Sequence, residues 1–289
     1  MSAKRGMGGV IFGATKPRPS GAMCAVPISV FIIAQNEADN IGRCLASLEG
    51  VSDSVFVIDG GSTDNTRDIA ESTGAVVIEH AWEGFAAQKN FALTQCHHDW
   101  VLTLDADEEL SEALRAEIMD IRIQLAELWV RDHVGGWAMP RRVCYEGQWI
   151  KHGDWNPDFV VRLFRREGAR YEGAVHESIH CEGEKRSLTH LIHHYSYRDR
   201  ADHLARLEKY STLWAQSKSA QGKSAGVLAP GVRAGWRFVR GFLLKTGFLD
   251  GKLGFRIAAL GARETWLKYQ KLRVLNRRGR VPKPGGGAN

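Results

Sequence analysis

The 289-residue chain has a globular composition, with 44% hydrophobic and 25% charged residues. This balance excludes a collagen, a largely disordered chain and a small scaffold held together by disulfides. The formal net charge of +6 is unevenly divided, since the chain from Lys185 onward holds 22 basic and 5 acidic residues, and the chain before it 17 and 28. An acidic front part and a basic rear part suggest two tasks, the second one facing an anionic partner.

Strands and helices alternate in the front part of the chain. Continuous β-branched and aromatic runs predict buried strands over residues 28–34, 54–58, 75–78 and 100–104. The spacing of apolar residues predicts helices over residues 36–49, 62–73, 85–93 and 112–129. This alternation is typical of an α/β fold with a mostly parallel sheet flanked by helices.

The pattern changes after residue 129. Shorter strands are expected over residues 137–150, 159–164, 171–175 and 188–195. From Asp199 the spacing is helical up to a linker at 221–226, and further helical segments are expected over residues 232–244 and 253–275. These segments predict a C-terminal helical appendage on the α/β fold.

The cysteines and the N-terminus indicate the compartment. No two of the five cysteines have Cys-x-x-Cys spacing, which argues against a zinc ribbon and a redox pair. Residues 1–26 are rich in Pro and Gly and lack the apolar core of a signal peptide, which predicts a flexible tail. No stretch approaches the roughly 18 apolar residues of a membrane-spanning helix. We therefore expect a reduced, cytoplasmic chain that does not cross a membrane.

Acidic and polar residues stand at the ends of three predicted strands. Asn36 and Glu37 follow the first strand, Asp59 ends the second, and Asp105 and Asp107 end the fourth. Ligands of open parallel sheets bind beyond these carboxyl ends. An Asp-x-Asp triplet alone arises often by chance, but here it follows a buried strand and is accompanied by the other strand-end acids. Paired carboxylates there suit Mg²⁺ together with a nucleotide diphosphate.

Four sequence blocks resemble the nucleotide-sugar domain of family 2 glycosyltransferases, and they occur in that family's order. They span residues 28–110 and read ISVFIIAQNEADNIGRCLASL, VFVIDGGSTDNTRDIA, GFAAQKNFAL and WVLTLDADEEL. The later blocks YEGAVHESI, LIHHYSY and GFLDGKLGF resemble the branch with lipopolysaccharide core β-1,4-glucosyltransferases. The resemblance implies inverting enzymes with a GT-A fold. Together with the sequence patterns, it suggests a nucleotide-sugar part (27–110), an acceptor side (111–198) and a basic helical region facing the membrane or the acceptor (199–276). The Gly- and Pro-rich composition predicts a flexible tail at 277–289.

The resemblance also implies which residues bind the donor nucleotide: Ala34, Asn36, Glu37, Asp59, Lys89 and Asp105. Asp59 would accept a hydrogen bond from uracil, and Asp105 would face the ribose or the metal. Lys89 stands where many relatives carry Arg, near the base or the phosphates, and keeps the charge without the bidentate fork. Asp107 would bind the Mg²⁺ or Mn²⁺ ion that bridges the diphosphate.

An inverting transfer needs a carboxylate that takes the proton of the acceptor hydroxyl. Glu177, in the family's His-Glu block, is the candidate base, with Glu172 and Asp154 as rivals. His176 could orient it or contact a phosphate.

Two further sets of residues have a structural role as the alternative to a functional one. His193 and His194 point to opposite faces of a strand, which argues against a zinc site with His190, but His194 matches a family block and could contact the metal or the pyrophosphate. Arg162 and Arg165 lie near the anionic donor or form structural ion pairs.

The basic rear part mixes cations with aromatic and aliphatic residues. It has no nucleic-acid-binding signature, so an anionic membrane surface explains it better, unless the helices merely pack on the first domain. The sequence therefore predicts a metal-dependent transferase that moves a hexose, most simply glucose from UDP-glucose, to a glycolipid such as the lipopolysaccharide inner core, at the inner face of the cytoplasmic membrane. The alternatives are another nucleotide-sugar donor, a polyprenyl-linked or protein acceptor, and a non-catalytic membrane or nucleic-acid binding protein on a degenerate domain.

Overall fold

The computed structural model describes residues 25–173, 177–197 and 200–278. The chain forms two compact units. The sheet unit contains the chain up to Arg141 together with Asp158–Tyr195, and the helical unit contains Arg142–Pro157 and the chain from Ser196 onward. The predicted acceptor side, residues 111–198, therefore contributes to both units.

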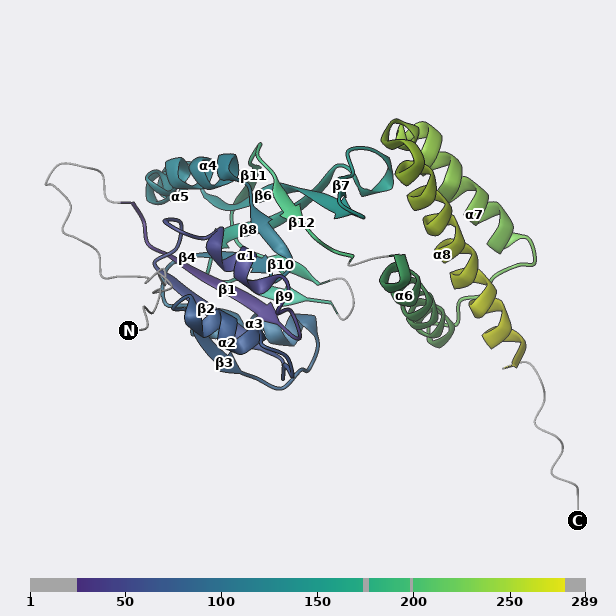
Figure 1. Cartoon of the computed structure of the whole chain (residues 1–289), viewed down its shortest axis with the longest axis horizontal. Helices are drawn as coiled ribbons and strands as arrows, with labels where there is room; N and C mark the ends of the chain where they lie inside the picture. Colours follow the sequence, from purple (N-terminus) through teal and green to yellow (C-terminus); the bar gives the residue numbers. More distant parts are fainter. Residues whose placement is uncertain (1–24, 174–176, 198–199, 279–289) are drawn as a thin grey trace, which may run out of the picture. The chain divides into compact units, whose positions relative to one another are not determined.

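Four parallel strands form one half of the main sheet (Figure 1). Their order is β3 (Val76–Glu79), β2 (Ser54–Asp59), β1 (Ile28–Ala34) and β4 (Trp100–Asp105). The connections contain α1 (Ile41–Ala46), α2 (Thr66–Ser72) and α3 (Phe85–Gln95). Every residue of β1 is buried, as its continuous apolar run predicts for a central strand covered on both faces.

The other half of the sheet is largely antiparallel. From β4 outward its order is β8 (Asp158–Arg165), β6 (Val134–Tyr145), β12 (Ile192–His194) and β5 (Glu108–Leu110). β7 (Gln148–Trp149) and β11 (Glu184–Ser187) also pair with β6, while β9 (Arg170–Glu172) and β10 (Ser178–His180) form a separate pair. The α/β class is confirmed. The continuous run of parallel strands is β3, β2, β1 and β4, and β11 also pairs with β6 in parallel.

Two buried clusters hold the sheet unit together. On β1, Val30 and Ile32 join the cluster that includes α1 and α2 together with α4 (Glu112–Arg122) and α5 (Leu125–Asp132). Phe31 and Ile33 join the cluster on α3. Alternate residues of a strand point to opposite faces, so β1 anchors both cores.

Several predicted elements have different bounds in the structure; for example, the strand expected over 188–195 is only β12. The first helix is only α1, because Asn36 adopts a left-handed φ of 56° and the chain turns before Ile41. The helix predicted over 112–129 is split into α4 and α5. The strand predicted over 137–150 ends at Tyr145, because Glu146 and Gly147 have positive φ and turn the chain into β7.

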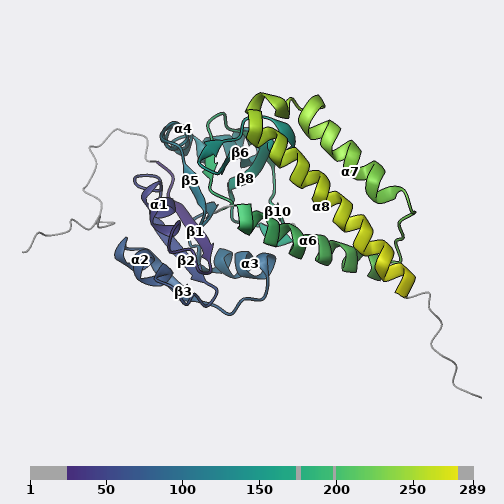
Figure 2. The same ribbon diagram turned by 45° about the vertical axis from the view of Figure 1, so that its right-hand side comes forward.

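The helical unit consists of three long helices and short turns. α6 (Arg200–Ala220) and α7 (Ala229–Val239) both pack against α8 (Gly251–Arg278), and Figure 2 shows α8 running alongside α7. A π-helical turn η2 (Arg240–Leu244) and a 3₁₀ turn η3 (Gly247–Asp250) connect α7 to α8, and η1 (Gly153–Trp155) belongs to the same unit. The predicted helical appendage is confirmed. Within the described ranges, no helix is long and apolar enough to span a membrane.

Candidate functional site

The ends of β1 and β2 bring the first predicted donor residues together. Ala34 and Asp59 are register partners at the ends of these strands. Asp59 is fully buried, and its carboxylate accepts hydrogen bonds from the N–H groups of Gly61 and Ser62 at 3.1 and 2.9 Å and from the Ser62 hydroxyl. The loop after β2 therefore fixes this carboxylate at the sheet edge.

The loop after β1 is tied to the loop after β2. The side-chain oxygen of Asn36 accepts a hydrogen bond from the N–H of Thr63 at 2.8 Å, and the Asn36 N–H donates to the Ser62 hydroxyl at 2.9 Å. The N–H of Glu37 donates to the Thr66 hydroxyl at 2.8 Å. These bonds explain the left-handed backbone at Asn36, and they hold the first four predicted donor residues on two neighbouring loops.

Lys89 joins an acid of the front strands to an acid of the later strands. Its side chain is almost completely buried, and its Nζ lies 2.9 Å from Asp105 Oδ1 and 2.8 Å from Glu177 Oε1. Asp105 ends β4, Lys89 lies on α3, and Glu177 directly precedes β10. The ammonium group of Lys89, a predicted donor residue, therefore contacts both Asp105, another predicted donor residue, and Glu177, the predicted base.

The second oxygen of Asp105 is held by Arg162. The Arg162 guanidinium lies 2.5 Å from Asp105 Oδ2 and 2.5 Å from Glu108 Oε1. Burial alone would raise the pKa of Asp105, but Arg162 and Lys89 outweigh it and hold that pKa well below its usual range. Both carboxylate oxygens of Asp105 are therefore occupied by cations of the chain itself.

The sequence did not reveal the role of Glu108. This residue is buried on β5, its Oε2 accepts from the Asp105 N–H at 3.0 Å, and Arg141 lies 3.0 Å from its Oε1. Arg141 also pairs with Asp158 at 2.8 Å. The available signal was a run of acids after the fourth strand, in which Glu108 takes the buried position of the short strand β5.

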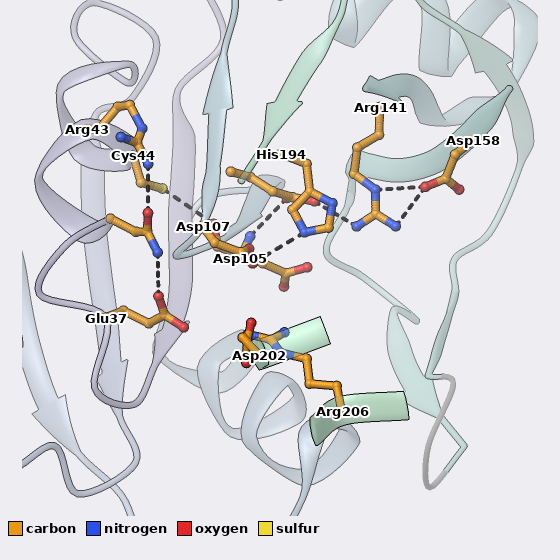
Figure 3. A network of polar contacts seen from close by, with 12 residues as sticks. Glu37, Arg43, Cys44, Asp105, Asp107, Arg141, Asp158, His194, Asp202 and Arg206 are labelled. Atoms are coloured by element: carbon orange, nitrogen blue, oxygen red, sulfur yellow. Dashed lines mark hydrogen bonds and ion pairs between the residues drawn. The ribbon is translucent and has the colours of Figure 1, made fainter. Parts of the chain in front are cut away.

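Asp107 and His194 form a second polar pair beside Asp105 (Figure 3). His194 Nε2 lies 3.3 Å from Asp107 Oδ2, because β12 pairs with β5 and places His194 opposite Glu108. The other ring nitrogen of His194, Nδ1, is buried and has no hydrogen-bond partner among the described residues. The Tyr195 N–H donates to the Asp107 carbonyl at 2.9 Å and holds the two strands in this register.

This pair fits one divalent cation bound with a diphosphate. A carboxylate and an imidazole are both common ligands of Mn²⁺, and Mg²⁺ sites often use one or two protein ligands plus phosphate oxygens. Within the described part of the chain, no group of three or more His, Cys, Asp or Glu side chains could hold a metal by itself. The Asp107 carboxylate and the His194 imidazole lie close enough to contact one cation, while both oxygens of Asp105 already contact Lys89 and Arg162.

A cleft of about 480 Å³ opens beside the contact of Lys89 with Asp105 and Glu177. Its polar lining includes Lys89, Asp105, Arg162 and Glu177, and Tyr171 adds an aromatic wall. This volume is within the usual range for a small-molecule site. Arg141 and Lys185 also line the cleft, so its four cations outnumber its two acids and favour an anionic ligand.

The structure does not bring every predicted residue to this cleft. Arg165 pairs with Trp100 at the opposite end of β4 from Asp105, where it contacts Glu167 at 2.6 Å. His176 lies outside the described residues. Of the two rival bases, Glu172 is exposed and paired with Arg170, and Asp154 belongs to the helical unit.

The chain is similar in sequence to glycosyltransferases. Residues 29–120 match the family model described as glycosyl transferase family 2. The chain is 30% identical over 263 residues to an uncharacterized glycosyltransferase of Rickettsia typhi, which covers 88% of this chain and 89% of that protein. It is 34% identical over 206 residues to the lipopolysaccharide core biosynthesis glycosyltransferase LpsC of Rhizobium meliloti, which covers 68% of this chain and 74% of LpsC.

Among solved structures, glucosyl-3-phosphoglycerate synthase of Mycobacterium tuberculosis in complex with Mn²⁺, UDP and glucosyl-3-phosphoglycerate is 22% identical, with a TM-score of 0.30. The match covers 44% of this chain, and the chain spans about half of that structure, 51% of its length.

Proposed function

The chain belongs to glycosyltransferase family 2, and from that premise we propose that it transfers a hexose, most simply glucose, from a UDP-sugar to a lipid-linked acceptor such as the lipopolysaccharide inner core. Its α/β sheet flanked by helices is the GT-A architecture that the sequence resemblance implied. A non-catalytic binding protein on a degenerate domain is not supported, because the chain is a glycosyltransferase. The relationship to LpsC supports a glycolipid as the acceptor.

The observation that carries the proposal is the shared contact of Lys89 with Asp105 and Glu177 at the cleft. The nucleoside would lie on the two tied loops after β1 and β2, against Ala34, Asn36, Glu37 and Asp59. The diphosphate would extend along the sheet edge toward Lys89. Asp105 would hold Lys89 in place and face the ribose.

Asp107 and His194 would hold the divalent cation, Mg²⁺ or Mn²⁺. A cation bound there neutralises charge on the diphosphate and so makes UDP a better leaving group. The 3.3 Å separation of His194 Nε2 and Asp107 Oδ2 supports this proposal, because one cation could contact both side chains.

Glu177 would act as the base of a direct displacement. Its carboxylate takes the proton of the acceptor hydroxyl while the acceptor oxygen bonds to the anomeric carbon from the side opposite UDP. The bond between that carbon and the UDP oxygen breaks, and the electron pair leaves with UDP. Lys89 orients the Glu177 carboxylate at 2.8 Å in the free protein and meets the phosphate charge once the donor is bound.

Release of UDP tests these assignments. The chelator-treated protein should be inactive and should recover with Mg²⁺ or Mn²⁺, and a donor screen should favour UDP-glucose. We expect Asp107→Ala to remove metal-dependent activity, and Glu177→Gln to lower turnover by about 10²–10⁴-fold. Glu172→Gln is the matched control, because this neighbouring acid is exposed and paired with Arg170. Full turnover of Glu177→Gln, or equal losses in both variants, would remove Glu177 as the base.

A further inference from the structure

The helical unit carries an apolar stripe that no described element covers. The stripe runs from the residue before α7, along α7 and into η2, at intervals of four, four, three and four residues, which is helical spacing. Its members are between 38% and 76% exposed. They are Leu228, Val232, Trp236, Val239 and Leu243.

The stripe continues over the turn between α7 and α8. Four large apolar side chains there are between 47% and 63% exposed, namely Leu244, Phe248, Leu249 and Phe255. Single exposed apolar residues are ordinary, but a contiguous set of this kind marks an interaction surface. We call these nine residues the apolar ridge.

Basic residues alternate along the chain with the residues of the apolar ridge. Between residues 228 and 256 the chain has six Arg or Lys residues and one acid, Asp250. Asp250 is turned inward, where it accepts from the N–H groups of Lys151 and His152 at 3.1 and 2.8 Å. Two acids from elsewhere in the unit also reach this segment, since Asp154 pairs with Arg237 and Arg240, and Glu146 pairs with Arg256. Counting all three acids, the segment keeps a surplus of three positive charges.

The ridge is held rigidly by close glycine contacts. A Cβ on Gly247 would lie 2.5 Å from the carbonyl oxygen of Gly241, and a Cβ on Gly254 would lie 1.8 Å from that of Gly247. The backbones of η2, η3 and α8 therefore approach as closely as glycine allows. The apolar side chains are displayed on a packed turn and not on a fraying end.

We propose that the apolar ridge seats the protein in the interface of an anionic lipid bilayer, with its apolar side chains at the acyl boundary and the bordering Arg and Lys side chains at the headgroups. An amphipathic helix with an apolar face and a basic border has the chemistry of an interfacial element. A second copy of the chain fits this surface less well, because the like charges around both ridges would repel. The inference rests on the proposed function in one respect, since a lipid-linked acceptor would lie at that interface.

Sedimentation with vesicles tests the proposal on the full chain. We expect binding to vesicles of phosphatidylethanolamine with phosphatidylglycerol, weaker binding to phosphatidylcholine vesicles, and a loss of binding as salt is raised. Trp236→Ser with Leu243→Ser should weaken binding about tenfold or more, because both side chains leave the acyl boundary. Arg233→Gln with Lys252→Gln should weaken it to a similar degree and reduce the salt dependence.

The matched control is Val130→Ser on α5, which removes an 84% exposed apolar side chain from the sheet unit and should leave binding unchanged. Thermal unfolding of each variant shows that the fold is retained. UDP release without vesicles should be equal in all variants. If the parent protein released no UDP, this would count against the proposed function and not against the membrane role of the ridge. Absence of vesicle binding, equal loss in the Val130 variant, or a self-association abolished by the Trp236 and Leu243 substitutions would overturn the proposal.

Discussion

Replacing Arg162 with Met tests whether the buried charges hold the strands of the site together. Arg162 is 5% exposed and touches Asp105 Oδ2 and Glu108 Oε1, both at 2.5 Å. Met retains much of the apolar length of the side chain, so the substitution mainly removes the guanidinium. Two carboxylates then lose a shared cation: Glu108 is fully buried, whereas the Asp105 side chain lines the cleft and is 30% exposed.

The expected cost follows from what remains around the two carboxylates. Removing one partner of a buried ion pair costs about 3–5 kcal/mol. Lys89 stays 2.9 Å from Asp105, and Arg141 stays 3.0 Å from Glu108, so neither acid is left alone. We therefore expect Arg162→Met to lower the free energy of unfolding by about 3 kcal/mol, at the lower end of that range. This is a large share of the about 5–15 kcal/mol typical of a folded protein.

Urea unfolding at pH 7 measures this loss, and Arg165→Met on the same strand is the control. Arg165 pairs with the exposed Glu167 and lies over the Trp129 ring, so its removal should cost about 1 kcal/mol. Adding Asp105→Asn should recover part of the Arg162→Met loss. The reasoning fails if both Arg variants lose equal stability, or if Asp105→Asn brings no recovery.

The same variant has a pH signature. Arg162 and Lys89 lower the pKa of Asp105 in the folded state, so this carboxyl stabilises the fold above its unfolded pKa of about 4, and that contribution is lost as pH falls through the lower folded value. The difference between the parent protein and Arg162→Met should therefore be full at pH 7 and shrink under acid conditions below about pH 4.

Three further predictions concern other contacts. Gly254→Ala places a methyl 1.8 Å from the Gly247 carbonyl oxygen and should destabilise the protein by about 2 kcal/mol or more. Gly235→Ala has open space around it and should stabilise α7 by about 0.5–1 kcal/mol. Thermal unfolding compares the two variants, and equal effects would contradict the close packing at Gly254. Burial lowers the pKa of His203, so the free energy of unfolding should fall as pH drops below the unfolded pKa of about 6.5. His203→Gln should flatten this part of the pH–stability profile measured by urea unfolding, and an unchanged profile would refute the role of His203. Lys89→Met should lower UDP release about 100-fold or more, because it removes the cation between Asp105 and Glu177, and parent-like kinetics would disprove this role.

The parallel strands were predictable because their signal is local. β1 is a continuous apolar run that is buried over its whole length, so composition alone marks it as a central strand. The later strands are shorter and depend on partners far away in the chain. β5 and β12, for instance, form because Glu108–Leu110 and Ile192–His194 pair across more than eighty residues, and neither segment indicates by its own sequence which strand it pairs with.

The site shows the same difference between features that local sequence predicts and features that depend on tertiary packing. The strand-end positions of Asp59, Asp105 and Asp107 followed from the sequence, because strand ends can be read from local patterns. The partners of those acids could not be read, since Lys89, Arg162 and His194 reach them only through tertiary packing.

The helical unit is an insertion in a β-hairpin as well as a C-terminal segment. The chain passes between the two units after Arg141, Pro157 and Tyr195. A truncation after Tyr195 would remove α6 to α8 but keep residues 142–157, whose buried Tyr145 and Ile150 pack with Ile257 of α8. Such a fragment would expose these side chains and should aggregate. Arg141 and Asp158 are register partners on β6 and β8, so a short turn between them could replace the insertion. Isolating the sheet unit therefore requires two changes to the gene, the replacement of residues 142–157 and the truncation after Tyr195. Truncation alone would not remove the whole helical unit.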